Sequence, residues 1–355
     1  MPYLVVNLLL LVIFFVALKQ MPLSHKNRNI IALIITFGCI LFFHTFKDYR
    51  LLPDIPGYVR AWKYICHTHS IYLYAGDYYK MQWGYFELNK LLSYISHSTY
   101  FFLFALGCMV SLPYCYLISK YSKNIQLSCV LYFMGFIQST FVLRQHAAIG
   151  FCLLTIPILM NNKMLLKPFV LLLWVIAISV HPTAVVFGLV IGAAFVRNIR
   201  WWFLIAAVFG VFLYIYYPRL VALFVGNTHG YQTYVNALYE YTNYSTAMLH
   251  CSLWLIATIV LYPFEKLDDV NRFFYRIMCI IAVFAIVSGM QKGGELIPRL
   301  IMYLTAIECI FIPNVGRQIK NIPLRYAFYS LFLTLNLYLF AFSGKSRINE
   351  CHLIF

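Results

Sequence analysis

The sequence predicts an all-α, polytopic integral membrane protein with about 12 transmembrane helices in a single membrane domain, residues 1–355. Hydrophobic residues make up 63% of the chain and charged residues only 11%, whereas soluble domains are roughly half apolar and a quarter charged. One water-soluble core could not bury this excess. Long apolar runs alternate with short charged or Pro/Gly-containing connections. We therefore expect most of the chain to be solvated by lipid.

The apolar runs define the candidate spans, because a transmembrane helix needs about 20 mainly apolar residues. In chain order they are 3–18, 29–46, 99–119, 125–143, 145–160, 165–180, 182–196, 201–217, 247–263, 273–290, 299–313 and 325–342. The short spans 145–160 and 182–196 are candidates for broken or partly re-entrant helices. The first span lacks a basic n-region and a small-residue cleavage site, so we expect a retained span and not a removed signal peptide.

Two connections are long, residues 47–98 and 218–246. Aromatic residues fill the first of them, including Trp62, Trp83 and Tyr85. Such side chains suit helices that lie at the lipid headgroups, and they can also stack on sugar rings. We expect both connections to be large outer loops, with interfacial helices in 47–98.

The distribution of basic residues predicts the orientation of the spans. The net charge is +16, from 27 Lys and Arg against 11 Asp and Glu. When the spans are threaded alternately, fifteen of the cations fall on one side. The connections on that side lie near 19–28, 120–124, 161–167, 197–200, 264–276 and 314–325. Cytoplasmic loops carry the excess of Lys and Arg, so this side is predicted to be cytoplasmic. Because the cations are scattered between apolar runs, no nucleic-acid partner is expected.

Ionisable residues at the outer ends of the spans are the candidate functional residues, since charge near hydrocarbon is costly unless it snorkels or faces a wet cavity. Asp48, Arg50, Asp54 and Tyr58 follow the second span. A carboxylate held by a neighbouring cation can act as a base, but these residues also fit a solvated interfacial pair. Glu87 begins an amphipathic stretch and is either a further carboxylate of the site or an ordinary helix-start residue.

Basic and histidine-containing turns follow on the same side. Arg144 either binds an anion, for which a guanidinium is well shaped, or snorkels to lipid phosphates. Arg299 follows a proline at the mouth of a span and is similar to Arg144 in this respect. His181, before Pro182, is either a base or a hydrogen-bonded core residue. Together these positions predict an outward cavity with carboxylates and arginines.

The cysteines give no sign of a metal site. The ten residues show no CxxC or Cys/His spacing suited to zinc, and most lie inside apolar runs. We expect no metal and no cofactor.

In order and spacing, the outer elements resemble those of the EpsG/Wzy-type bacterial polysaccharide polymerases, multi-span glycosyltransferases of O-antigen and exopolysaccharide assembly. The matching elements are Asp54 to Tyr58 (Asp-x-x-x-Tyr), Glu87 to Leu92, Arg144 to Ala148, His181 to Ala184 and Arg299 to Tyr303. The usual Gly-x-Asp context of the first element is absent, and Pro53-Asp54-Ile55-Pro56 stands there instead. The choice between Asp48 and Asp54 therefore stays open.

The resemblance implies transfer of a growing glycan from its undecaprenyl-diphosphate carrier to a new lipid-linked oligosaccharide, at the periplasmic or extracellular face of the bacterial cytoplasmic (inner) membrane. The implied roles are diphosphate binding for Arg144, Arg299 and Arg50, proton abstraction for Asp48, Asp54, Glu87 or His181, and sugar contact for Tyr58 and Tyr303. Membrane lipids, a chain-length regulator and a flippase are the implied partners. The alternatives are a transporter of lipid-linked glycans and an O-antigen ligase. A transporter would place charges near the midplane and show inverted repeats.

Overall fold

The computed structural model describes residues 2–50, 54–68, 82–137, 142–161, 166–196, 198–226, 267–290 and 300–338. The helices within these ranges, in chain order, are α1 (Pro2–Gln20), α2 (His25–Phe46), α3 (Ile55–Thr68), α4 (Trp83–Ser93), α5 (Thr99–Tyr121), α6 (Ile125–Ile137), α7 (Leu143–Leu159), α8 (Lys167–Val180), the 3₁₀-helix η2 (Pro182–Phe187), α9 (Gly188–Phe195), α10 (Ile199–Gly226), α13 (Asp269–Met290), α15 (Thr305–Gln318) and α16 (Ile322–Tyr338). No strand occurs in these ranges, which confirms the all-α class.

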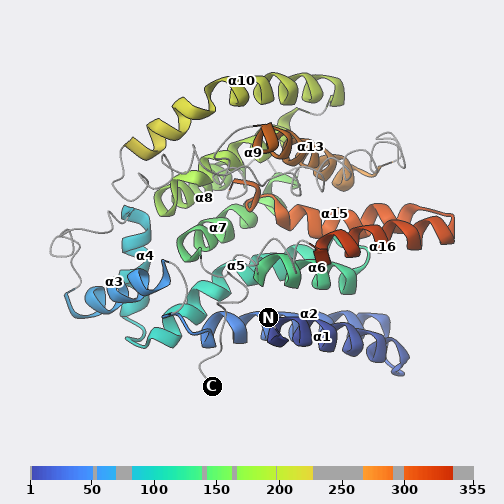
Figure 1. The fold of residues 1–355 in the computed structure, drawn as a ribbon, viewed down its shortest axis with the longest axis horizontal. Helices are drawn as coiled ribbons and strands as arrows, with labels where there is room; N and C mark the ends of the chain where they lie inside the picture. Colours follow the sequence, from blue (N-terminus) through green and yellow to red (C-terminus); the bar gives the residue numbers. More distant parts are fainter. Residues whose placement is uncertain are drawn as a thin grey trace.

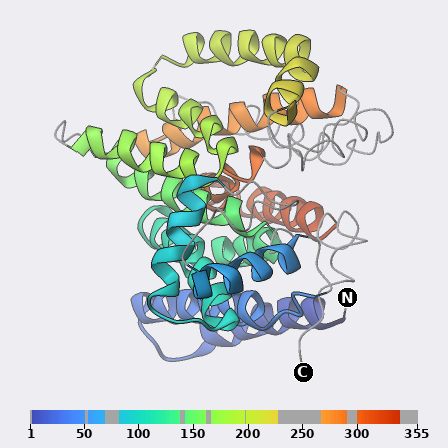
Figure 2. The same cartoon turned by 90° about the vertical axis from the view of Figure 1, so that its left-hand side faces the viewer.

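The long helices are stacked side by side in one bundle (Figure 1). The α1–α2 hairpin forms one edge and α10 the opposite edge, with α5, α6, α7 and α15 between them. The most extensive contacts join α7 to α8, α5 to α7 and α2 to α5. Helices α3 and α4 lie at one end of the bundle, and they face the viewer in Figure 2.

Most predicted spans overlap with helices where the structure describes them. Helix α15 begins only at Thr305, later than the predicted span 299–313, and the span 247–263 lies outside the described residues. The span 182–196 is broken, as expected, into η2 and α9. The span 145–160 is not broken, because α7 runs continuously from Leu143 to Leu159 with Pro157 only in its last turns. Helix α10 continues to Gly226 through the apolar run that follows residue 219, so the second long connection begins later than predicted.

Two helices of the described ranges, α2 and α5, are long and apolar enough to cross a membrane. Further apolar helical stretches of 10–17 residues, within α1 and α6 to α10, are shorter than this limit. The edge helices α1 and α10 expose large hydrophobic side chains, as a surface in contact with lipid does. These features indicate a membrane protein, and the number of spans stays a prediction.

The first long connection contains α3 and α4, which pack against the bundle. Trp62 on α3 is fully buried and stacks on Phe102 of α5, with ring centroids 4.7 Å apart. Tyr85 on α4 is also fully buried, whereas Trp83 is exposed. The aromatic residues of α3 and α4 therefore divide between core packing and an exposed surface that suits the headgroups, because both helices are amphipathic and turn one face inward.

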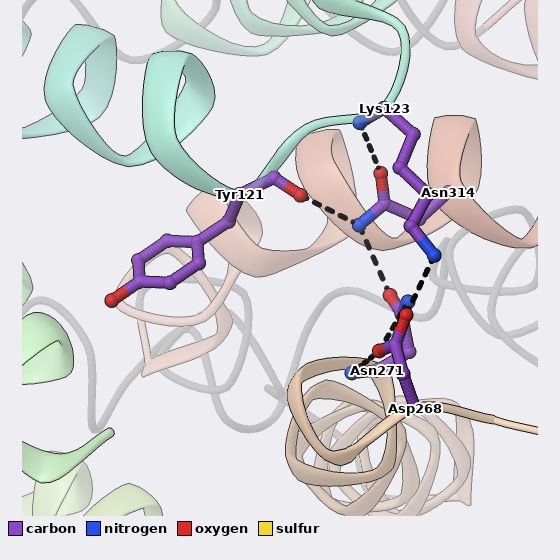
Figure 3. Close-up of polar contacts among 5 residues, drawn as sticks. All are labelled: Tyr121, Lys123, Asp268, Asn271 and Asn314. Carbon is purple, nitrogen blue, oxygen red and sulfur yellow. Dashed lines mark hydrogen bonds and ion pairs between the residues drawn. The ribbon is translucent and has the colours of Figure 1, made fainter. Parts of the chain in front are cut away.

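At the other end of the bundle, five residues form a polar cluster that we call the Asn314 cluster (Figure 3). Its members are Tyr121, Lys123, Asp268, Asn271 and Asn314. The Nδ2 of Asn314 donates to the Tyr121 carbonyl (2.8 Å) and to Asn271 Oδ1 (3.0 Å), and its Oδ1 accepts from the Lys123 backbone N–H (2.6 Å). Lys123 Nζ lies 2.6 Å from Asp268 Oδ2. The cluster thus joins three connections that the charge distribution predicts on one side of the membrane, namely 120–124, 264–276 and 314–325.

Candidate functional site

Arg144 is held at the end of the bundle that carries α3 and α4. It lies in the first turn of α7 and is half-buried. Its Nε donates to the Tyr58 hydroxyl (3.0 Å) and its Nη1 to Gln82 Oε1 (2.5 Å), while the guanidinium carbon sits 5.2 Å from the centre of the Tyr58 ring. Tyr58 belongs to α3 and Gln82 caps the start of α4. We call these three residues the Arg144 cluster.

The Arg144 cluster orients a cation without neutralising it through these bonds. A tyrosine hydroxyl and a glutamine amide are neutral acceptors, so these two bonds fix the direction of the guanidinium without supplying a counter-charge. The Tyr58 ring is itself fixed by an edge-to-face contact with buried Tyr85, at 6.0 Å between centroids. Such a preorganised cation is suited to bind an anion such as phosphate.

A close packing of α4 on α8 connects this cluster to the histidine turn. A Cβ atom added at Gly84 would lie 2.1 Å from Ser179 Oγ and 2.7 Å from the Ser179 carbonyl carbon. Only glycine permits this approach, because backbone atoms of α8 would have to move for any other residue. Ser179 lies two residues before His181, so the start of α4 and the end of α8 are neighbours.

His181 begins a buried hydrogen-bonded chain, which we call the His181 chain. Its Nδ1 lies 2.6 Å from Thr183 Oγ1, and Thr183 Oγ1 lies 3.1 Å from the Tyr303 hydroxyl. All three residues are buried. The His181–Thr183 contact forms because α8 ends at Val180 and Pro182 starts a 3₁₀ turn, which brings Thr183 back to the imidazole. The His181 chain brings together two predicted elements that are far apart in the sequence, since Thr183 and Tyr303 are separated by 120 residues.

The two carboxylates after α2 have different environments. Asp48 is bound bidentately by Arg50, with Nε to Oδ1 at 2.9 Å and Nη2 to Oδ2 at 3.1 Å, and its Oδ1 also accepts from the Arg50 backbone N–H. The hydrogen bond to Asp48 raises the pKa of the exposed Arg50 guanidinium above its ordinary value. Asp54 lies directly before α3, with a left-handed φ of 65° that aspartate tolerates better than most residues. Its carbonyl accepts from the Tyr58 N–H at 3.2 Å, which places it one turn from the Arg144 cluster.

Glu87 is a described candidate residue that is not brought into these clusters. Glu87 is half-buried on α4, and its carboxylate makes no hydrogen bond or ion pair within the part of the chain that the structure describes. It lies two positions after Tyr85, which points it to roughly the opposite side of the helix from that buried ring. Arg299 lies outside the described residues, although Tyr303 of the same predicted element belongs to the His181 chain.

Sequence reasoning missed Gln82 and Gly84 as site residues. The cost of charge near hydrocarbon marks only ionisable side chains, and neither an amide nor a glycine is ionisable. The available signal was their position beside Trp83 at the start of an amphipathic helix. It also left Lys47, His44 and His146 unassigned, although all three are buried at the same end of the bundle.

The helical fold, the lipid-compatible surface and a polar cluster at one bundle end define a helical membrane protein with an oriented cation. The comparison with protein families identifies it further. A family model described as the EpsG family matches residues 31–351, and the chain belongs to this family. The resemblance predicted from the outer elements is thereby confirmed. No significant match was found among curated proteins or among solved structures.

Proposed function

We propose that the protein is a membrane glycosyltransferase that polymerises oligosaccharide repeat units carried on undecaprenyl diphosphate. Membership of the EpsG family supports a polysaccharide-polymerase type of role. The observation that carries the proposal is Arg144, which is held by Tyr58 and Gln82 from two other helices at the same end as the His181 chain. The product would be O-antigen, capsule or exopolysaccharide.

The proposed reaction has a simple atom balance. A hydroxyl oxygen of the incoming lipid-linked unit attacks the anomeric carbon at the end of the growing glycan. The bond between that carbon and the phosphate oxygen breaks, and the lipid diphosphate leaves with the bonding electrons. The hydroxyl proton passes to a base on the protein. Charge therefore develops on the departing diphosphate, and an oriented cation beside it lowers the barrier.

In this proposal Arg144 binds the departing diphosphate, with Arg299 as a second cation. Asp54 is the preferred base, because it lies one turn from Tyr58, whereas the Asp48 carboxylate is already bound by Arg50. Tyr58 orients Arg144 and also presents an aromatic ring near the site.

The remaining candidates have supporting roles in the same proposal. His181 is an alternative base, and Tyr303 holds it through Thr183. Glu87 is an alternative carboxylate on α4. The site would face the periplasm or the exterior of the bacterial cytoplasmic membrane, with lipid around the bundle, and a flippase and a chain-length regulator would act beside it.

The test is complementation of a strain that lacks the gene, with surface glycan analysed as a ladder on a gel. Arg144→Ala and Arg299→Ala are expected to abolish long chains, with a loss of about 100-fold or more for one preorganised cation. Arg60→Ala is the matched control for Arg144→Ala, since Arg60 is an exposed arginine of α3. The variants must insert and accumulate like the wild type. A ladder that stays unchanged in both arginine variants would contradict the proposal.

The same strain separates the alternative functions. Loss of a polymerase leaves single repeat units on the carrier or the lipid core at the outer face. Loss of a flippase traps the units on the cytoplasmic side, and loss of a ligase leaves long glycan on the carrier. The second and third outcomes would each replace the polymerase assignment.

A further inference from the structure

Three cations gather where α15 ends and α16 begins. Arg317 lies in the last turn of α15, Lys320 in the connection and Arg325 in the first turn of α16. Arg317 and Lys320 are exposed, and Arg325 is half-buried. Helices α15 and α16 lie side by side and reach the end of the bundle opposite to α3 and α4 (Figure 1). We call these three residues the basic patch.

Backbone carbonyl groups hold both arginines of the basic patch. Arg317 Nη1 donates to the Lys123 carbonyl in the connection between α5 and α6. Arg325 donates to the Ile319 carbonyl from Nε (2.8 Å) and from Nη2 (2.6 Å). A carbonyl oxygen is a neutral acceptor, so these bonds direct the guanidinium groups without supplying a counter-charge. Among the residues that the structure describes, no hydrogen bond or ion pair joins the basic patch to a carboxylate.

The basic patch stands on a rigid base. Asn314 and Arg317 are one turn apart on α15 and bind the same residue of the next connection, because Lys123 N–H donates to Asn314 Oδ1 at 2.6 Å and the Lys123 carbonyl accepts from Arg317. Helix α16 packs tightly on α15, since a Cβ atom added at Gly316 would lie 2.2 Å from the Tyr329 ring. The cations are therefore positioned before a ligand arrives, which reduces the entropy that binding costs.

Exposed apolar and aromatic side chains adjoin the cations. They are Ile322, Leu324 and Tyr326 at the start of α16. The connection 314–325 is one of those that the charge distribution predicts on the cytoplasmic side. A phospholipid has its phosphate at the headgroup level and its acyl chains directly beneath, so it suits cations beside exposed apolar side chains at the end of a membrane helix. Basic sites between helices on the cytoplasmic side are of the kind that binds anionic headgroups.

We propose that the basic patch binds an anionic phospholipid of the leaflet at this end of the bundle. The two arginines bind phosphate oxygens, for which the planar guanidinium is well shaped, and Lys320 adds a third positive charge. Ile322 contacts the acyl chains where they begin. The lipid is a partner and not a substrate, and this site lies at the end of the bundle opposite to the Arg144 cluster. It therefore does not depend on the proposed function.

The test is thermal unfolding of the purified full-length protein in a neutral detergent as lipid is added. Dioleoyl phosphatidylglycerol is the anionic probe, and dioleoyl phosphatidylcholine has the same acyl chains without net charge. The variants are Lys320→Gln and the double variant Arg317→Gln with Lys320→Gln. The matched control is Arg60→Gln with Lys63→Gln, which removes two exposed cations of α3.

We expect phosphatidylglycerol to raise the unfolding midpoint of the wild type by several degrees and phosphatidylcholine to have little effect. The concentration of phosphatidylglycerol for half of this shift should rise about fivefold in Lys320→Gln and about 30-fold in the double variant. The α3 control should respond like the wild type. Added salt should weaken the response, because it screens exposed charges.

Equal responses of the folded wild type to the two lipids would overturn the inference and leave the basic patch as an orientation signal or a site for an acidic protein. A wild-type response in the folded double variant would overturn it as well. If the double variant does not fold, Lys320→Gln decides, because the Lys320 side chain makes no hydrogen bond or ion pair with a described residue. Inorganic phosphate that stabilises the protein as well as phosphatidylglycerol would show a site for a free anion and not for a lipid.

Discussion

Removing the Asn314 side chain is expected to destabilise the protein strongly. Asn314 is fully buried, and Asn314→Ala deletes its hydrogen bonds to the Tyr121 carbonyl, to Asn271 Oδ1 and from the Lys123 N–H (Figure 3). Each hydrogen bond contributes about 1 kcal/mol net, and an abandoned buried partner costs about 1–3 kcal/mol. Lys123 is partly exposed, so water replaces part of its loss. Three such bonds contribute about 3 kcal/mol, and the abandoned buried partners add to this loss.

The assay is thermal unfolding of the purified protein in detergent, followed by the fraction that remains monodisperse on a sizing column after heating. Asn314→Ala should lower the midpoint by several degrees. Asn27→Ala is the matched control, because Asn27 is exposed at the start of α2, and it should change the stability by less than about 0.5 kcal/mol. Equal midpoints for the two variants would show that the Asn314 cluster does not hold α5, α13 and α15 together.

Three further predictions concern single groups. Tyr58→Phe keeps the ring under Arg144 but removes the hydroxyl that accepts a hydrogen bond from the Arg144 Nε. Since a charge-assisted hydrogen bond contributes about 1.5–3 kcal/mol, we expect polymer formation to fall about tenfold or more at unchanged protein abundance. Unchanged polymer formation would contradict the orienting role of Tyr58. Gly84→Ala should destabilise the protein by about 1–3 kcal/mol, because its Cβ would lie 2.1 Å from a side-chain oxygen of α8, whereas Gly38→Ala, with nothing within 4 Å, should be neutral in the same unfolding assay. Burial raises the pKa of Asp268, but hydrogen bonds from its lysine and asparagine partners outweigh this and hold that pKa below its ordinary 3.8. Its contribution to stability should therefore be complete above that value and be lost as the pH falls through the lowered pKa, and an Asp268→Asn variant should lack this acid-dependent loss in midpoints measured against pH.

The sequence predicted the helices well because each one follows from a local property. Apolar runs of sufficient length lie within α2 and α5, and the ends of these helices match the predicted spans to within a few residues. The sequence predicts a break equally in the spans 145–160 and 182–196, yet only 182–196 is broken. Its proline stands at the start of the run, where it begins a new turn, whereas Pro157 lies near the end of α7 and interrupts few hydrogen bonds.

The candidate site could be predicted only in part, because contacts between distant residues are not encoded in local patterns. Charge and the shared side of the membrane predicted that Tyr58 and Arg144 belong to one region, and the structure joins them across 86 residues. Nothing local indicated that Gln82 completes the pair. Its side chain is neutral, so a search based on the cost of charge in a membrane does not find it. For the same reason, the sequence does not identify Asn314 as the centre of the Asn314 cluster.

The two polar clusters use hydrogen bonds for different purposes. In the Asn314 cluster, Lys123 faces the carboxylate of Asp268, so the cation is neutralised by the same contacts that join the helices. In the Arg144 cluster, the two bonds to Tyr58 and Gln82 direct the cation through neutral acceptors, a phenol and an amide. A cluster that serves stability alone should tolerate loss of its charge pair with a change in midpoint only. A cluster that serves a substrate should lose activity when Arg144 becomes a neutral residue of similar size, even where the fold is retained.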